Sequence, residues 1–334
     1  MGLVRADRGK LNPRFFLYTY LSPEFQDFLR SKTITGATVD RIGLIEFPKF
    51  PILLPQLAEQ EAIASILGAL DDKIDLNRRM NETLEAMARA IFKDWFVDFG
   101  PTRAKMAEQA PYHDPAIWSA FPDRFDADGL PFGWSVCGLA DIANLNPSER
   151  LPQGTEAPYL DMASLPVRGS WPDKPTTRAA GSGARFRNGD TLVARITPCL
   201  ENGKTAFVSR LSDSAIAWGS TEFIVIRPRL PFPAEYGYLL ARHDAFRAHA
   251  IQSMTGTSGR QRVQPESLRS FPVVKPSDVV LRHFGEIVKG LFAKIPANEL
   301  ETETLAAFRD LLLPKLMSGE LRVRDAEKMV EAVL

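Results

Sequence analysis

Apolar side chains recur at alternating spacings of four and three residues through residues 57–98. The apolar members of this seam are Ile63, Leu67, Leu70, Ile74, Leu84, Ala88, Ile91 and Trp95. Neither Gly nor Pro interrupts the stretch after Gly68, and good helix formers dominate it, so the pattern predicts long helical structure. Asn77 and Asn81 occupy the same seam. A heptad seam that includes Asn predicts a partner helix, because a buried Asn fixes the register of a coiled coil.

A second seam with this spacing lies at residues 284–316. Its members are Phe284, Val288, Leu291, Ile295, Asn298, Leu305, Leu312 and Leu316. Pro296 lies inside it and predicts a helix start, because proline is tolerated in the first turn. We expect the two seams to pack as an antiparallel coiled coil, with Asn77 and Asn298 setting the register. The alternative is that each helix only covers the core of a domain.

The two seams belong to an internal repeat with a shift of 221 residues. Phe50–Pro55 matches Phe271–Pro276, and the same shift pairs Asn77 with Asn298. Each half is predicted to hold a turn-rich loop, a short β segment that ends in Phe-Pro, and long helices. The second repeat begins near Leu130, so the first copy is expected to lack a counterpart of residues 131–220.

Short β runs between Gly, Pro and Asn turns are typical of residues 131–232. The predicted strands are Trp134–Cys137, Thr191–Ile196, Thr205–Val208 and Phe223–Ile226. Glu235–Ser253 is predicted to be one helix and Thr255–Pro265 a polar loop, whereas residues 101–130 are predicted to be an irregular connection. The predicted fold class is therefore α+β, with a mixed β/α domain and long helices that form an antiparallel coiled coil.

The composition agrees with a globular protein in a reducing compartment. The chain has 334 residues, of which 45% are hydrophobic and 25% are charged. Its two cysteines, Cys137 and Cys199, are too few for a disulfide framework or a four-cysteine zinc site. No apolar run approaches the roughly 18 residues that a membrane span needs. We therefore expect a cytoplasmic protein without membrane contact.

The formal net charge is zero, but the charges are divided unevenly along the chain. Residues 174–275 carry 15 basic and 7 acidic residues, a net charge of +8, and Arg supplies 12 of the 15 cations. The guanidinium group suits planar recognition of phosphate and guanine. The window therefore indicates nucleic-acid binding, and the alternative is a basic surface without a ligand.

Three loops of this window carry side chains suited to DNA. Thr255–Arg262 combines glycines, hydroxyls, an amide and two guanidinium groups, which can contact phosphates and base edges together. Arg195–Lys204 joins two predicted strands, and Gly219–Glu222 precedes another. Plain turn chemistry is the alternative for their Gly and Ser residues. The predicted DNA-binding residues are Arg185, Arg187, Arg195, Asn202, Lys204, Ser220, Thr221, Thr257, Ser258, Arg260, Gln261 and Arg262.

The residues predict no catalytic or metal site. Asn202–Thr205 resembles the end of a phosphate-binding loop, but Pro198 stands where the first Gly is needed. Asn12–Phe15 resembles the catalytic tetrapeptide of amino-methyltransferases, without the Gly-rich cofactor loop. The histidines lack metal-ligand spacing; they are His113, His243, His249 and His283. We therefore expect a chain without catalytic activity, cofactor or metal.

Several motifs together resemble the specificity subunits of type I restriction–modification enzymes. They are Pro55–Gln60, Leu70–Asn77, Asp94–Pro101, Leu130–Trp134 and Leu312–Leu321. In that family each subunit has two target recognition domains separated by long helices. Each domain reads one half of a split DNA target, and the helices set the gap and bind the methyltransferase subunits.

The resemblance implies five regions. They are the tail of a first target recognition domain at 1–55, spacer helices at 56–100, a connector at 101–130, a complete target recognition domain at 131–275, and spacer helices at 276–334.

The resemblance also implies a DNA-recognition subunit without catalytic activity. Its expected partners are double-stranded DNA, the methyltransferase subunits, the restriction/translocase subunit and a second copy of the chain. Adenine methylation and ATP-driven cleavage, with S-adenosylmethionine, ATP and magnesium, are then expected on the partner subunits. The alternative is a truncated scaffold that binds partner subunits and no DNA.

Overall fold

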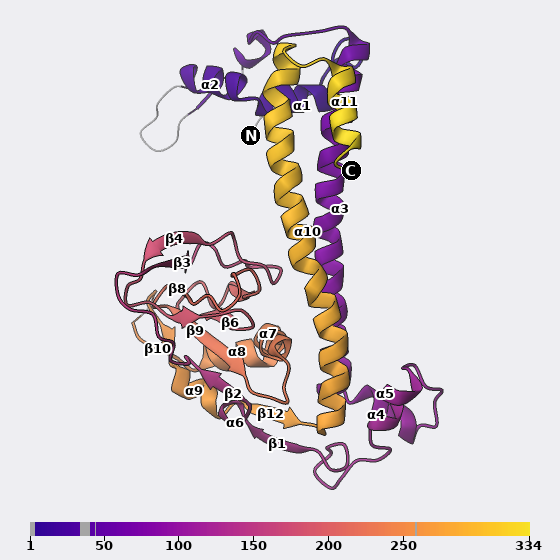
Figure 1. Ribbon diagram of the computed structural model, residues 1–334, viewed down its shortest axis with the longest axis vertical. Helices are drawn as coiled ribbons and strands as arrows, with labels where there is room; N and C mark the ends of the chain where they lie inside the picture. The colour runs from indigo at the N-terminus through magenta and orange to yellow at the C-terminus, as the bar shows by residue number, and fades with distance from the viewer. Residues whose placement is uncertain (1–3, 34–40, 44, 258) are drawn as a thin grey trace. The chain divides into compact units, whose positions relative to one another are not determined.

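The structure is a computed structural model that describes residues 4–33, 41–43, 45–257 and 259–334. It divides into two compact units, of which unit 1 holds residues 1–80 and 298–334 and unit 2 holds residues 81–297. Two long helices, α3 (Leu57–Phe96) and α10 (Asp278–Ser318), each contribute one part to each unit (Figure 1).

The long helices pack antiparallel, as expected. Within unit 1, the Arg309 guanidinium donates to Asp71 at 2.7 Å and the Asn77 amide donates to Glu301 at 2.8 Å. Residue numbers therefore rise along one helix as they fall along the other. The α+β fold class and the antiparallel packing of the helices are confirmed.

Helix α10 runs unbroken through Pro296, so the prediction that this proline starts a helix is wrong. Proline removes one backbone N–H from the helical ladder. The neighbouring Phe292 and Ile295 are 5% and 3% exposed within a hydrophobic core, and this burial holds the helix together across the missing hydrogen bond.

The remaining helices of unit 1 are short. They are α1 (Pro13–Leu21), α2 (Pro23–Ser31), the 3₁₀ turn η1 (Phe47–Lys49) and α11 (Val323–Glu331). Asn12 caps α1, because its side-chain oxygen accepts from the backbone N–H groups of Arg14 and Phe15 at 2.9 and 3.1 Å. The tetrapeptide Asn12–Phe15 is therefore a helix start. Phe15 and Tyr18 are buried in the core of unit 1.

Unit 2 combines short helices and strands. The helices are α4 (Gly100–Met106), α5 (Pro115–Ala120), α6 (Leu139–Ile142), α7 (Ala234–Arg242), α8 (Asp244–Gln252) and α9 (Pro265–Arg269). The strands are β1 (Ser135–Gly138), β2 (Ala143–Leu145), β3 (Glu156–Leu160), β4 (Thr176–Ala179), β5 (Arg185–Phe186), β6 (Thr191–Ala194), β7 (Thr205–Phe207), β8 (Ala217–Gly219), β9 (Phe223–Pro228), β10 (Met254–Thr255), β11 (Arg262–Val263) and β12 (Pro272–Lys275).

The strands of unit 2 form small sheets. One has the order β2-β9-β6-β7 and is antiparallel throughout, and another has the order β4-β3-β8-β5, with β3 and β8 parallel. β1 pairs with β12 and β10 with β11, both antiparallel. Helix α7 packs closely on the first sheet at Gly237, where an added Cβ would come within 2.9 Å of the Pro228 ring.

The internal repeat is visible as matching helix bounds. At the shift of 221 residues, α1 corresponds to α7, α2 corresponds to α8, and α3 begins where α10 begins. Among the described residues of the first copy, no strand matches β12. The predicted β segments that end in Phe-Pro are wrong: β12 begins at Pro272 of the second Phe-Pro, and residues 51–56 form no strand.

The predicted strands and loops of unit 2 have mixed outcomes. The four predicted strands are confirmed as β1, β6, β7 and β9, whereas β2, β3, β4, β5, β8, β10 and β11 were not predicted. The single helix predicted over Glu235–Ser253 is wrong, because His243 has extended backbone and its ring Nδ1 accepts from the Ala245 N–H at 3.3 Å. The predicted loop Thr255–Pro265 contains strand β11 and ends where the short helix α9 begins, at Pro265, and the predicted connector 101–130 contains α5 and most of α4.

Two further features bear on function. No helix of the described part of the chain has both the length and the apolar character that crossing a membrane requires. Across the same residues, no three His, Cys, Asp or Glu side chains gather as they would to hold a metal ion.

Candidate nucleic-acid interface

The hairpin β10–β11 presents the first of the three predicted loops. Met254 pairs with Val263 and Thr255 with Arg262, so the described residues 256, 257 and 259–261 belong to the turn between the two strands. Gly256 has φ +124°, and an added Cβ there would lie 3.1 Å from the Arg260 carbonyl oxygen. This position therefore favours glycine. Thr257 and Arg260 are exposed on the turn, and Ser258 lies outside the described residues.

Backbone hydrogen bonds bring the three loops together. The Val263 N–H donates to the Arg195 carbonyl at 2.9 Å, and the Thr197 N–H donates to the Gln261 carbonyl at 3.0 Å. The Arg195 N–H in turn donates to the Glu222 carbonyl at 3.0 Å. Segments that lie far apart in the sequence thus become one surface. We call Arg195–Lys204, Gly219–Glu222 and Thr255–Arg262 together the three-loop surface.

Glu222 is the ionic centre of the three-loop surface. Its carboxylate accepts from Arg262 Nε at 2.9 Å and from Arg262 Nη2 at 2.7 Å, and it lies 3.6 Å from Arg195 Nε. The hydrogen bond from Arg262 to Glu222 raises the pKa of Arg262. Two guanidinium groups face one carboxylate, so the arrangement keeps one net positive charge. The fork geometry of arginine fixes the hairpin against the Gly219–Glu222 loop.

A pocket of about 370 Å³ adjoins this centre and collects three predicted residues. Arg185, Arg195 and Thr221 line it, together with Asn146 and Ser148. Arg185 Nε is buried without a hydrogen-bond acceptor among the described residues, whereas the buried Arg195 Nε faces the Glu222 carboxylate at 3.6 Å. The Arg185 Nε donor suits an anionic or base-edge ligand.

Other predicted residues have structural partners. Lys204 Nζ donates to the Met162 carbonyl at 2.7 Å, and Ser220 Oγ accepts from the Glu222 N–H at 3.1 Å, which is turn chemistry. Arg187 lies 3.7 Å from Glu149, with a side chain that is 55% exposed.

Asn202 is exposed and lines a separate pocket of about 440 Å³. Arg168 and Arg247 line the same pocket, and sequence reasoning did not select them as DNA-binding residues. Asn146 and Ser148 beside Arg185 were missed in the same way, because no local motif marks them.

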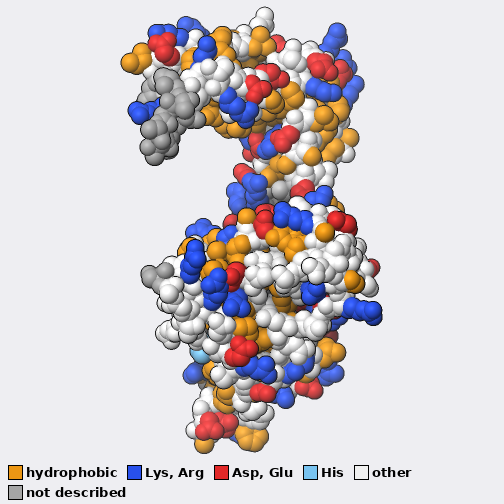
Figure 2. Space-filling model, turned by 90° about the vertical axis from the view of Figure 1, so that its left-hand side faces the viewer, with side chains coloured by type: hydrophobic (Ala, Val, Ile, Leu, Met, Phe, Trp, Pro, Cys, Tyr) orange, Lys and Arg blue, Asp and Glu red, His pale blue; other side chains and the backbone are white. Residues whose placement is uncertain are grey.

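Much of the arginine-rich window supports the fold. Arg227 donates to Asp190 at 2.6 and 2.7 Å, and Arg242 donates to several loop carbonyls, including those of Val167 and Gly203 at 2.8 Å. The face of unit 2 over β3, β4 and β10 accordingly shows separate clusters of Lys and Arg between acidic and uncharged groups (Figure 2). The net charge of +8 is therefore not one continuous basic patch.

The two predicted register residues meet within unit 1. Asn77 is fully buried, and its amide lies 3.5 Å from the Asn298 carbonyl oxygen as well as donating to Glu301. Lys73 lies 3.3 Å from Glu301, so a small polar cluster interrupts the apolar seam.

Comparisons with known proteins agree with this architecture. The sequence model of the family described as "Type I restriction modification DNA specificity domain" matches residues 3–86. The HindI specificity subunit of Haemophilus influenzae is 24% identical over 376 residues, covering 96% of this chain and 80% of that protein. The MjaIX specificity subunit of Methanocaldococcus jannaschii is 22% identical, covering 93% and 69%. The crystal structure of a type I S subunit from M. genitalium shares the fold, with a TM-score of 0.51 and 16% identity over 93% of this chain and 74% of that one.

Proposed function

We propose, from the premise that this chain is a specificity subunit of the type I restriction–modification family, that unit 2 binds double-stranded DNA through the three-loop surface. The observation that carries the proposal is the convergence of three separately predicted loops around Glu222. The exposed side chains of this surface include Thr221, Thr257 and Arg260, which can contact phosphates and base edges.

The geometry of the surface suits a duplex. A two-stranded β ribbon fits the major groove, which is about 12 Å wide. The hairpin β10–β11 is such a ribbon and exposes Thr257 and Arg260 at its turn. Arg260 can bind a phosphate or a guanine edge. Arg262 is bonded to Glu222 and stabilises the hairpin.

The chain itself is the non-catalytic member of its system. We assign adenine methylation and ATP-dependent cleavage to partner subunits in the cytoplasm, which would hold S-adenosylmethionine, ATP and magnesium. The long helices offer a surface for those partners. On α10 within unit 1, Leu300, Thr304, Ala307 and Leu311 are exposed at heptad spacing, and Leu300 and Leu311 are 62% and 53% exposed. An exposed apolar stripe of this spacing suits a partner helix.

The same stripe favours a second candidate function, in which the chain is a scaffold that binds partner subunits without DNA. Selection from random-sequence duplexes distinguishes the two. The purified chain, alone and with its methyltransferase subunits, is mixed with the duplex pool, and bound DNA is amplified and sequenced. DNA recognition predicts enrichment of one sequence pattern. If the chain forms its complex with the methyltransferase subunits but enriches no DNA sequence, DNA recognition is excluded and the scaffold function is supported.

A further inference from the structure

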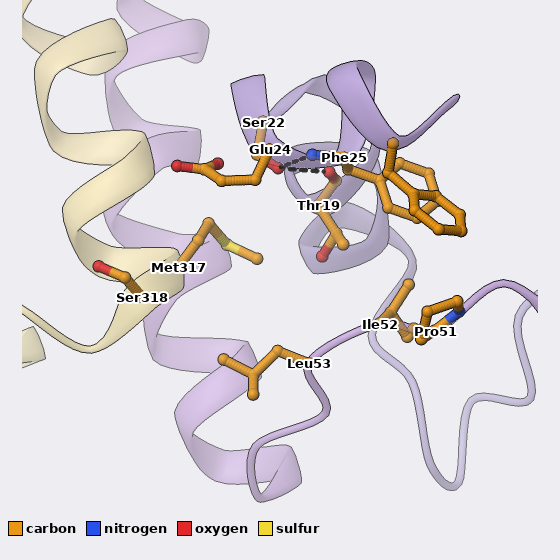
Figure 3. Close-up of a pocket in the computed structure, with 10 residues that line it drawn as sticks. Thr19, Ser22, Glu24, Phe25, Pro51, Ile52, Leu53, Met317 and Ser318 are labelled. Carbon is orange, nitrogen blue, oxygen red and sulfur yellow. Dashed lines mark hydrogen bonds between the residues drawn. The ribbon is translucent and has the colours of Figure 1, made fainter. Parts of the chain in front are cut away.

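Unit 1 contains an open pocket of about 260 Å³ beside the end of α10. Figure 3 shows that Thr19 of α1, Met317 of α10 and Leu53, which precedes α3, point toward the same space. The other lining residues are Ser22, Glu24, Phe25, Phe28, Pro51, Ile52 and Ser318. Most of this lining is apolar, so water in the pocket is easily displaced by an apolar ligand group.

The internal repeat shows what covers the corresponding place in unit 2. At the shift of 221, residues 51–54 correspond to 272–275, which form β12. Strand β1 covers β12, with Cys137 opposite Val273 and Val136 opposite Val274. The pairing continues past the strand, where the Leu139 N–H donates to the Phe271 carbonyl at 2.9 Å.

An aromatic side chain anchors that strand in unit 2. Trp134, directly before β1, is 5% exposed and lies 6.3 Å from the Phe96 ring. The counterpart of Phe96 at the shift of 221 is Met317, which lines the pocket of unit 1. The pocket of unit 1 therefore corresponds to the place in unit 2 that Trp134 and β1 occupy.

The matching side chains of unit 1 are more exposed than their counterparts in unit 2. Leu53 is 62% exposed, whereas its counterpart Val274 is partly buried against the core. Leu17 of α1 is 49% exposed, whereas its counterpart Tyr238 is 0% exposed. Among the residues that the structure describes, no backbone hydrogen bond joins residues 52–54 to another segment. A segment with unpaired backbone and exposed apolar side chains is a template for an added strand.

We propose that unit 1 binds an extended segment of another polypeptide, which resembles Leu130–Leu139 and adds to residues 51–54 as an antiparallel strand. Main-chain hydrogen bonds would supply affinity, and an aromatic anchor in the pocket would supply specificity. The register of unit 2 sets the counterpart of Cys137 opposite Ile52. This strand addition does not depend on DNA recognition, because the repeat, the pocket and the exposed residues of unit 1 support it.

The correspondence between the two units extends only to the added strand and its aromatic anchor. Phe16 stands where the second repeat has Gly237, the residue that packs closely on a sheet. A bulky ring cannot make that close approach. The occupant is therefore a partner with a similar first strand and a different sheet behind it.

A labelled peptide tests the proposal on the full chain. The probe is residues 130–142 of this sequence with a fluorescein group, titrated with the purified protein in a reducing buffer while anisotropy is measured. Saturable binding is expected. A Cys137→Pro peptide should bind at least about tenfold more weakly. Cys137 lies two residues before Leu139, so its backbone N–H also faces the partner strand, and proline removes this N–H.

Two substitutions in the chain provide the matched comparison. Leu53→Lys places a charge in the pocket and should weaken binding about tenfold. Leu54→Lys adds the same charge at the neighbouring position, where the second repeat has Lys275, and should change binding less than about twofold. Both leucines are more than half exposed, so the fold is expected to tolerate either change.

Absence of saturable binding by the wild-type chain would overturn the proposal. Binding that survives Leu53→Lys would also overturn it, because the peptide would then occupy another place such as the β12 edge of unit 2. A chain that self-associates through unit 1 and excludes the peptide would identify a second copy as the occupant instead.

Discussion

Arg262 shows that the role of a side chain depends on neighbours that are remote in sequence. Read in its own loop, it resembles Arg260, and both were expected to contact DNA. In the structure Arg262 is bonded to Glu222, 40 positions earlier, while Arg260 is exposed at the turn. Local sequence identified the loop but not the pairing, because only the folded topology brings β11 beside the Gly219–Glu222 loop.

Charge reversal at Arg262 should therefore damage the hairpin before it affects DNA. Arg262→Glu places two carboxylates together and is expected to lower the thermal unfolding temperature. Arg262→Gln removes the positive charge without adding a carboxylate, so it should lower the unfolding temperature less than Arg262→Glu does. Thermal unfolding by circular dichroism measures both variants. An Arg262→Glu variant that unfolds at the wild-type temperature would show that the ion pair does not hold the hairpin.

Glu235 gives a pH-dependent signature in helix α7. Burial raises the pKa of Glu235, so its ionised form is disfavoured in the folded state. Below the pKa of the unfolded state, near 4.3, Glu235 is protonated in both states and does not reduce stability. As the pH rises above this value the free energy of unfolding decreases, and the decrease is complete above the pKa of the folded state. Glu235→Gln should therefore raise the unfolding temperature at pH 7, and the gain should vanish below about pH 4. An equal gain at both pH values would assign the effect to packing.

Whole elements were more predictable than single contacts. The heptad seams and the 221-residue repeat identified the two long helical regions, because their apolar spacing persists over many turns, although α10 was expected to start anew at Pro296. The break at His243 was missed, since the helical pattern continues across it and one ring nitrogen caps the next helix. Strand β4 was missed because it is exposed throughout and shows no alternation of buried and exposed positions, and β5 was missed because it has two residues.

The long-helix pair makes its own prediction at Asn77. Asn77→Ala removes the donor to Glu301 and leaves a cavity, and it should lower the free energy of unfolding by about 2 kcal/mol. Asn77→Leu refills the seam and should cost less. Urea denaturation compares the variants. If alanine and leucine cost the same, the side-chain volume in the seam contributes nothing and the hydrogen bond alone accounts for the loss.

For the whole molecule, charge matters through its distribution. Zero net charge excludes neither DNA nor protein partners, because residues 56–173 are acidic while residues 174–275 carry +8. Even that window is partly neutralised within the fold, by pairs such as Arg227 with Asp190 and Arg262 with Glu222. The arginines expected to reach DNA are then those that the fold leaves exposed, with Arg260 foremost.

The salt dependence of DNA binding by Arg260→Glu tests the central claim most directly. Arg282→Glu is the matched control, because Arg282 is also exposed in unit 2 but lies on α10, away from the three loops. Affinity for the selected duplex is measured by anisotropy at several salt concentrations. Loss of one phosphate contact should make the slope of log K against log salt shallower by about 1 and weaken binding about tenfold, while the control keeps both values. An Arg260→Glu variant that matches wild type in slope and affinity would contradict DNA recognition by the three-loop surface.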